Sequence, residues 1–208
     1  MRFLSVERMR AADRAAVAER GIPGFALMSR AGAAVARAAE RLAALRGARA
    51  AVVVAGHGNN GGDACVAARC LHEDGYRVRV LMACDPARLT GDAREAWEEM
   101  RAAGVPVVAL ATEAGWREAG GPAAVAPPRQ GVLIDGVLGT GCKGAPAGAA
   151  ALAIDWINRM RRHALVISID LPSGMDGDTG EAAGACVRAD LTVTFARPKR
   201  CFLNPAHA

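Results

Sequence analysis

The chain has 208 residues, of which 52% are hydrophobic and 23% charged, and its formal net charge is +5. This length suffices for one sizeable core, and no apolar run approaches the roughly 18 residues that would span a bilayer. Only two of the 26 basic residues are lysines, aromatic residues make up 4%, and the arginines are scattered along predicted helices beside acidic residues. The composition therefore argues against a membrane or a nucleic-acid partner.

The N-terminal residues 1–16 interleave charged and apolar side chains, which predicts a helix and not a signal peptide. The six cysteines form no C-x-x-C pair, and the four histidines show no metal-binding spacing. We therefore expect reduced, buried thiols and a cytoplasmic location.

Two helices are predicted before the first strand. Ser5 is a suitable N-cap for a helix that runs to about Arg20, where Gly21 stops it. A second helix is predicted over about 25–45, because its apolar residues recur at helical spacing. We expect the two helices to form an N-terminal cap on the sheet.

Strands and helices alternate over the rest of the chain. The expected strands are apolar throughout, as in a sheet that is covered on both faces, and lie at 51–55, 77–83, 105–110, 132–135, 165–169 and 190–195. The expected helices lie at 62–74, 92–103 and 147–162, with a short one near 113–119. The pattern predicts an α/β fold, with a doubly wound, mainly parallel Rossmann-like sheet and helices on both faces. Segment 119–130, rich in Gly, Ala and Pro, is interpreted as a loop inside a single domain over 1–208.

A glycine-rich turn follows the first predicted strand, in the sequence AGHGNNGGDACVAARCL of residues 55–71. Its glycines match G-x-G-x-x-G, and such a turn presents backbone N–H groups and a helix N-terminus to an anion. Asn59, Asn60 and Asp63 are additions to that pattern. A carboxylate here repels a pyrophosphate unless a cation or a hydrogen-bond donor lies between them. The alternative is that Asp63 only caps the helix.

Two further loops carry polar residues directly after strands. The loop IDGVLGTGCKGAP places Asp135 at the end of strand 132–135, and IDLPSGMDGDTG places Asp170 at the end of strand 165–169. If the strand order is 3-2-1-4-5-6, these strands neighbour strand 51–55, and all three loops meet at the ligand crevice. A single such aspartate is readily explained as a turn residue, but three on adjacent strands favour a site.

The motifs GHGNNGGDA, IDGVLGTG, IDLPSGMDGDTG and ADLTVTFARPK together resemble the NAD(P)H-hydrate epimerase family, or YjeF N-terminal domain. GIPGFALMSRAG also resembles the family's second-helix segment, and the motif order is the same over nearly the whole chain. The resemblance implies an isomerase that interconverts the R and S forms of hydrated NADH and NADPH (NADHX and NADPHX). It also implies a homodimer and a partner dehydratase, dependent on ADP or ATP, that takes the S form.

The resemblance also implies the site residues. Substrate would be held by Asn59, Asn60, Gly61, Gly62, Asp63, Gly139, Thr140, Gly141, Cys142, Lys143, Gly144, Ala145 and Asp170. One potassium ion per subunit would be held by Asn60, Asp135 and Ser173. A cation with oxygen ligands would also relieve the repulsion among the three crevice aspartates, although charge alone leaves K⁺ and Mg²⁺ open. We expect Asp170 to be the acid–base residue, because a rigid strand end aims it, with Lys143 as a second catalytic candidate.

The chain departs from the family pattern at two places. Residues 27–32 read LMSRAG where the family commonly has LMENAG, and the sequence stops before the family's glycine-rich loop, so we expect a domain without the family's last strand. Whether the full-length chain carries a dehydratase domain stays open. Two alternatives remain. One is an NAD-dependent dehydrogenase with Asp85 on the ribose, against which stands Asp63 in the phosphate loop. The other is a non-catalytic nucleotide-binding scaffold. The preference for NADHX or NADPHX and the chemical route stay open.

Overall fold

The structure is a computed structural model that describes residues 3–118 and 131–204. Within these residues, six strands form one all-parallel sheet in the order β3-β2-β1-β4-β5-β6. The strands are β1 Ala50–Ala55, β2 Arg77–Met82, β3 Val107–Ala109, β4 Val132–Gly136, β5 Leu165–Ile169 and β6 Leu191–Val193. This order confirms the doubly wound arrangement and places β1, β4 and β5 side by side. The segment 119–130, interpreted from sequence as a loop, lies outside the described residues.

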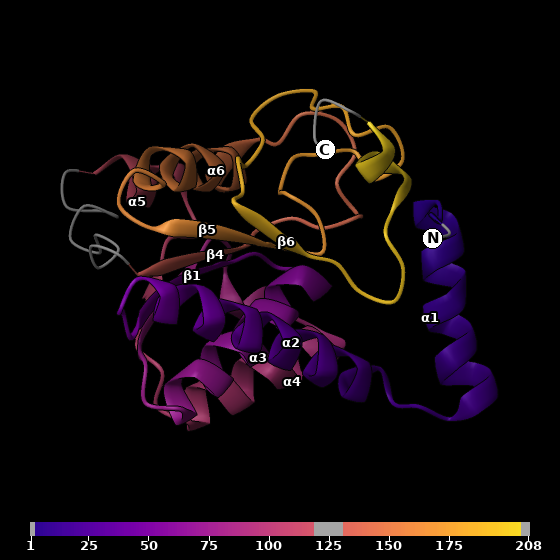
Figure 1. Cartoon of the computed structure of the whole chain (residues 1–208), viewed down its shortest axis with the longest axis horizontal. Helices are drawn as coiled ribbons and strands as arrows, with labels where there is room; N and C mark the ends of the chain where they lie inside the picture. Colours follow the sequence, from indigo (N-terminus) through magenta and orange to yellow (C-terminus); the bar gives the residue numbers. More distant parts are fainter. Residues whose placement is uncertain (1–2, 119–130, 205–208) are drawn as a thin grey trace.

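Helices cover both faces of the sheet (Figure 1). The helices are α1 Val6–Arg20, α2 Gly24–Leu45, α3 Asn59–Glu73, α4 Gly91–Ala102, α5 Glu113–Arg117 and α6 Gly148–Met160. The loops of the described residues also contain the 3₁₀ helices Pro86–Arg88 and Arg200–Leu203. Helices α2, α3 and α4 lie on one face, and α5 and α6 lie on the other.

The sheet separates two apolar cores. Val53 and Ile134 pack with α2 and α3 on one side, whereas Val52, Val54 and Leu133 pack with α6 on the other. Every residue of β1 and β4 is buried, which explains why these strands are apolar instead of alternating, with Asp135 at the end of β4 as the exception.

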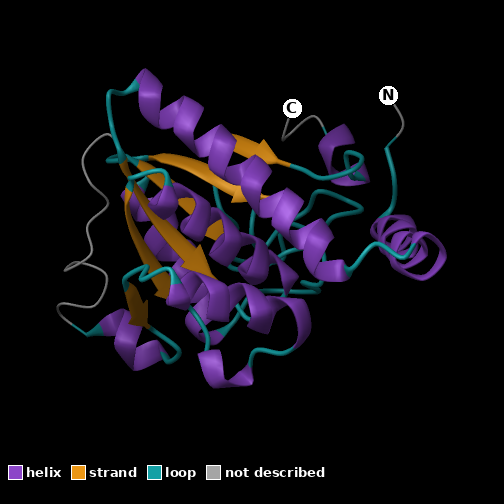
Figure 2. Cartoon of the chain, turned by 90° about the horizontal axis from the view of Figure 1, so that it is seen from below, coloured by secondary structure: helices purple, strands orange, loops and turns teal. Residues whose placement is uncertain are grey.

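Helix α1 differs from the sequence expectation. It does not cap the sheet, since it stands apart from the layers of the molecule in two perpendicular views (Figures 1 and 2), and Met9 is its one fully buried residue. The physical reason is composition, because α1 is rich in charged residues and lacks the wide apolar stripe that docks a helix on a core. Of the two N-terminal helices, α2 alone covers the sheet as expected.

Helix α3 also begins earlier than expected, at Asn59 and not at residue 62. Gly58 is its N-cap in extended conformation. Gly61 and Gly62 belong to the first turns of this helix, and glycine occupies both positions because neighbouring atoms leave no room for a side chain. A Cβ at Gly61 would lie 2.0 Å from the Gly56 carbonyl oxygen, and one at Gly62 would lie 2.6 Å from the Met28 sulfur. The edge strands β3 and β6 are shorter than expected, since each has a partner on one side only.

All six cysteines are free, with Cys65 and Cys201 buried and the other four partly buried. Burial raises the pKa of the Cys65 thiol to about 12, which keeps it protonated and unreactive. None of the described helices has the length and apolar character needed to cross a membrane.

Candidate active site

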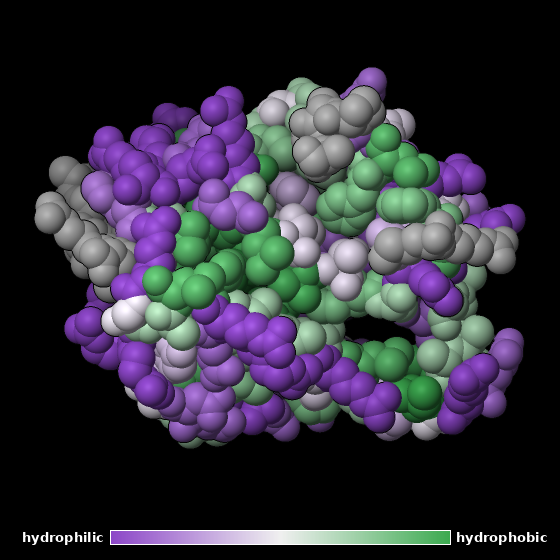
Figure 3. Space-filling view, viewed as in Figure 1, coloured by the Kyte–Doolittle hydropathy of each residue, from purple (hydrophilic) through white to green (hydrophobic). Residues whose placement is uncertain are grey.

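A cavity of about 1140 Å³ opens at the carboxyl ends of β1, β4 and β5. Its walls come from α1, α2, the start of α3, the loop after β4, the end of β5 and the segment after β6. Figure 3 shows the molecule hollowed between α1 and the body of the domain. This is the position at which doubly wound sheets bind ligands.

Asp135 is the buried anchor of the site, with no exposed surface. Its Oδ2 accepts hydrogen bonds from Ser168 Oγ (2.8 Å) and the Ser173 backbone N–H (2.9 Å). Its Oδ1 accepts from Ser173 Oγ (2.5 Å) and the Val137 N–H (3.3 Å). Burial raises the pKa of Asp135, and these hydrogen bonds oppose the rise. The carboxylate therefore ties the loop after β5 to the end of β4.

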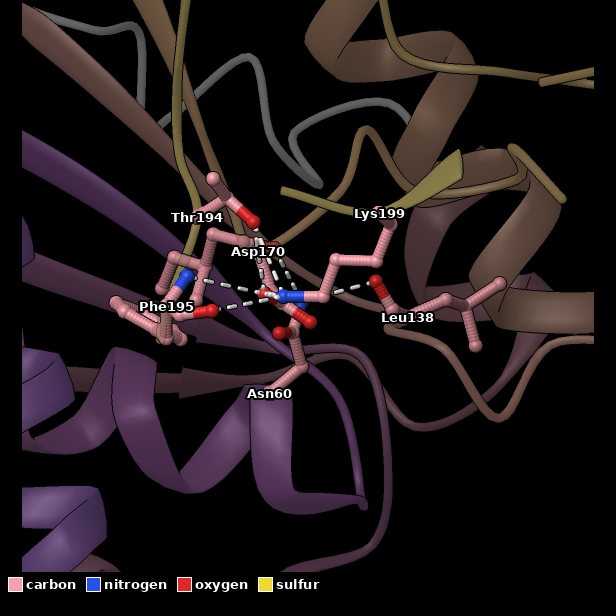
Figure 4. A network of polar contacts seen from close by, with 7 residues as sticks. Asn60, Leu138, Asp170, Thr194, Phe195 and Lys199 are labelled. Carbon is pink, nitrogen blue, oxygen red and sulfur yellow. Dashed lines mark hydrogen bonds and ion pairs between the residues drawn. The ribbon is translucent and has the colours of Figure 1, made fainter. Parts of the chain in front are cut away.

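Asn60 joins α3 to the same two strand ends. Its side-chain Nδ2 donates to the carbonyl oxygens of Leu138 (2.9 Å) and Ile169 (3.0 Å) (Figure 4). Ser173 Oγ also lies 3.0 Å from the Leu138 oxygen. Gly139 is confined by this arrangement, because a Cβ there would lie 3.1 Å from the Asn60 side chain. Amide, hydroxyl, carbonyl and carboxylate groups thus meet within one small region.

Asp170 lies at the end of β5 in the left-handed region, with a φ of 63°. Non-glycine residues seldom adopt this conformation, although Asp and Asn tolerate it best, and such strain is often found at functional sites. A hydrogen bond from its backbone N–H to the Val193 carbonyl (2.8 Å) holds the turn.

The Asp170 side chain is paired with Lys199 (Figure 4). Lys199 is 2% exposed, and its Nζ contacts Asp170 Oδ1, Thr194 Oγ1 (3.0 Å) and the Phe195 carbonyl (3.4 Å). Oδ1 also accepts from Thr194 Oγ1 (3.3 Å) and the Phe195 N–H (3.4 Å). All of these contacts use Oδ1, so Oδ2 of Asp170 has no hydrogen bond from the described part of the chain.

Asp63 is 8% exposed, lines the cavity, and accepts no hydrogen bond from any described residue. Burial raises its pKa well above the ordinary value, and the carboxylates of Asp170 and Asp13 raise it further. Because α3 begins at Asn59, Asp63 lies beyond the first turn, so helix capping does not explain it. Burial also raises the pKa of Asp13, which reaches the same cavity from α1.

The structure brings most of the expected substrate residues to the cavity wall, namely Asn59, Asn60, Asp63, Gly139, Thr140, Gly141, Cys142 and Asp170. Gly61 and Gly62 are buried behind the wall. Lys143, Gly144 and Ala145 are exposed and lie outside the lining.

The lysine that the structure places beside Asp170 is Lys199 and not Lys143. The sequence carried a signal for it, since Lys199 ends the motif ADLTVTFARPK and is one of only two lysines in an arginine-rich chain. The structure shows which of the two lysines contacts Asp170, and the role of Lys143 stays a prediction. The α1 residues Arg10, Asp13 and Arg14, which also line the cavity, belong to no recognisable motif.

Asp85, the expected ribose-binding acid of the dehydrogenase alternative, has a structural role. It is the N-cap of the 3₁₀ helix Pro86–Arg88, where its Oδ1 accepts from the Ala87 N–H at 2.9 Å. It does not line the cavity. The geometry therefore gives the dehydrogenase alternative no support.

The family described as "YjeF-related protein N-terminus" matches residues 24–201. The chain belongs to this family. A protein of Pirellula staleyi named NAD(P)H-hydrate epimerase is 38% identical, over 96% of this chain and 84% of the relative. One of Bordetella bronchiseptica with the same name is 40% identical, over 91% and 75%.

Longer relatives agree with this membership, and a solved structure shares the fold. A Hyperthermus butylicus protein named bifunctional NAD(P)H-hydrate repair enzyme Nnr is 43% identical, over 86% of this chain but 32% of its own length. The chain spans about a third of the length of such bifunctional relatives. The crystal structure of yeast ynu0 superposes with a TM-score of 0.81 at 24% identity, over 98% of this chain and 84% of that chain. The yeast structure confirms the fold.

Proposed function

We propose that this domain is an NAD(P)H-hydrate epimerase that interconverts the R and S forms of NADHX and NADPHX. The observation that carries the proposal is the meeting of three strand-end loops at one cavity: Asn60 and Asp170 line it, and Asp135, which does not line it as the sequence led us to expect, is fully buried and ties the loops together. Proteins named NAD(P)H-hydrate epimerase resemble this chain over most of both lengths, which supports the same activity here.

The substrate is expected to lie across the strand ends. The backbone N–H groups at the start of α3 suit its pyrophosphate, while the hydrated nicotinamide ring reaches Asp170. Two routes invert the ring carbon: loss of water and its return to the other face, or opening and reclosing of the C–N bond. Both routes need a proton to be moved at an oxygen or nitrogen atom.

Asp170 is the residue that we assign to this proton transfer. Lys199 holds Oδ1, and the unpaired Oδ2 is free to exchange a proton with substrate. Lys199 is then a positioning residue, because its ammonium group fixes the carboxylate and balances its charge. The left-handed turn at Asp170 places the carboxylate at the strand end instead of in the core.

Potassium is part of the proposal, with Asn60, Asp135 and Ser173 as its ligands. The oxygen atoms that converge there belong to hydroxyl, carboxylate, amide and carbonyl groups. Such oxygen ligands suit a hard cation. Asn60 now donates to two carbonyls, and turning its amide by 180° would offer Oδ1 instead. The ion would supply positive charge between the crevice carboxylates and a phosphate. No three His, Cys, Asp or Glu of the described residues cluster as a metal site, so the proposal rests on the mixed oxygen set.

The remaining proposals concern partners and location. We infer that the epimerase acts with a dehydratase dependent on ADP or ATP, which the bifunctional names of the longer relatives support. A homodimer and a cytoplasmic location are proposed on the family resemblance and the composition alone.

The decisive experiment is to incubate the purified domain with one NADHX epimer and to follow both epimers by chromatography, beside a protein-free sample. We expect the domain to speed the approach to the equilibrium ratio with no net redox change. An unchanged rate with folded, ligand-saturated protein would refute the epimerase. A change in absorbance on adding an oxidisable substrate would indicate a dehydrogenase, and binding without turnover would indicate a scaffold.

A further inference from the structure

Helix α1 forms one wall of the cavity with a single face. The residues of α1 that line the cavity are spaced at helical intervals and are Met9, Arg10, Asp13, Arg14, Val17 and Ala18. The N-terminal end of α1 is anchored beside Lys199, because the Leu4 N–H donates to the Pro198 carbonyl (3.0 Å) and the Arg200 N–H donates to the Leu4 carbonyl (3.1 Å). The start of the helix is thus held beside the segment that carries Lys199.

Charge balance in the cavity indicates what this wall binds. The proposed substrate carries a pyrophosphate, while Asp13, Asp63, Asp92 and Asp170 all line the cavity. Lys199 is occupied by Asp170. The other arginine and lysine side chains in the described lining are Arg10, Arg14 and Arg30. Beyond the proposed potassium ion and the N–H groups at the start of α3, a dianionic ligand therefore depends on these arginines for its countercharge.

Arg10 lies against the loop expected to hold the substrate. Its Nη2 donates to the Thr140 carbonyl at 3.1 Å and lies 3.6 Å from the position of a Cβ on Gly141. A guanidinium group has five N–H donors, so one bond to Thr140 leaves others for a ligand. Arg14 is one turn further along the same face, and it forms no hydrogen bond or ion pair with any described residue.

We propose that Arg10 and Arg14 bind the pyrophosphate of the dinucleotide, which makes α1 a part of the substrate site. The inference takes one thing from the proposed function, namely that the ligand is a dinucleotide, and it does not depend on the epimerase reaction. Arginine suits this role, because its planar donors match two phosphate oxygens at once. The roles then divide across the cavity, with recognition on α1 and proton transfer at Asp170.

The test uses ADP-ribose, a diphosphate that the epimerase does not turn over. Its affinity is measured by calorimetry for the parent, Arg10→Gln, Arg14→Gln and the double variant. We expect each single change to weaken binding about tenfold or more, as for the loss of a charged hydrogen bond. Arg8→Gln is the matched control, because Arg8 is an exposed arginine of α1 outside the cavity lining. It should bind ADP-ribose like the parent.

Three readouts decide the outcome. The epimerase KM should rise in both variants with kcat largely kept, and raising the salt concentration should weaken ADP-ribose binding less in the double variant than in the parent. Binding of adenosine, measured by ligand-observed NMR, should not change.

The proposal is overturned if the Arg10 and Arg14 variants bind ADP-ribose as tightly as Arg8→Gln does. It is also overturned if these variants lose as much affinity for adenosine as for ADP-ribose, since Arg10 would then only shape the loop. If the parent binds ADP-ribose through these arginines but does not epimerise NADHX, the proposed function fails and this inference stands.

Discussion

The two sides of the cavity are built differently. On the strand-end side, Asp135 and Lys199 are almost fully buried, and both are held by several short contacts. On the α1 side, Arg10 is exposed and is held by one hydrogen bond to a loop carbonyl. A buried, hydrogen-bonded group can be aimed at one atom of a substrate, whereas an exposed arginine contributes charge and tolerates small movements. Changes on the strand-end side should therefore affect turnover, and changes on α1 should affect affinity.

The largest effect is expected at Asp170. Asp170→Asn removes the titratable carboxylate and keeps the shape, and Asn also tolerates the left-handed φ of 63°. We expect kcat to fall by about 10²–10⁴-fold, the usual contribution of general acid–base catalysis, with substrate affinity largely kept. The measurement is the rate of epimer interconversion at a temperature where the variant is shown to be folded.

Asp155→Asn serves as its control, because Asp155 is an exposed residue of α6 and does not line the cavity. It should turn over like the parent. A variant of Asp170 that turns over like the parent, or that loses affinity alone, would contradict the assignment to proton transfer.

Lys199 should matter for stability as well as for turnover. Lys199→Met leaves the Asp170 carboxylate without its cation, and breaking a buried ion pair in this way costs about 3–5 kcal/mol, somewhat less here because Asp170 is 15% exposed. Urea unfolding measures the loss. The double variant with Asp170→Asn should recover part of it, because no unpaired charge remains.

The exposed Lys143 provides the matched comparison for Lys199. Lys143→Met should leave both stability and kcat close to those of the parent. If it slows turnover as much as Lys199→Met does, the lysine that assists Asp170 is Lys143, as the sequence suggested.

Potassium should stabilise the strand-end side. An ion that binds only the folded state adds about 2.7 kcal/mol at a concentration one hundred times its Kd. The melting temperature and kcat should therefore be higher in potassium chloride than in tetramethylammonium chloride of equal ionic strength. Ser173→Ala should remove this difference between the two salts. Equal values for the parent in both salts would rule out the proposed cation.

The smallest effect is expected at Asp63. Its raised pKa means that the folded state binds the proton more tightly than the unfolded state, so this stabilisation is present at acid pH and is lost as pH rises through the folded pKa. Asp63→Asn should raise the melting temperature at pH 7–8, with the gain vanishing near the unfolded pKa of about 3.9. The same change should weaken substrate binding. A gain of equal size at pH 4 and pH 8 would show that the ionisation of Asp63 is not its cause.

Much of the site follows from sequence alone. Buried parallel strands are apolar throughout, so their positions and their order along the chain are encoded locally. The residues that follow a strand necessarily lie at its carboxyl end, and in a doubly wound sheet these ends share one crevice. Asn60, Asp135 and Asp170 can therefore be assigned to one region from the sequence, since strand periodicity and topology place them together.

Only the tertiary structure decided which distant groups complete that site. Lys199 reaches Asp170 across 29 residues through the turn after β6. Lys199 ends the motif ADLTVTFARPK, but that motif does not show that Lys199, and not Lys143, lies beside Asp170. The wall formed by α1 depends on the position of a charged helix that has no apolar stripe to dock it. Hydrogen bonds of the Leu4 backbone and the Arg10 side chain set that position. Strand periodicity is a local property that a sequence displays, whereas the meeting of two side chains from separate loops depends on the packing of the whole chain.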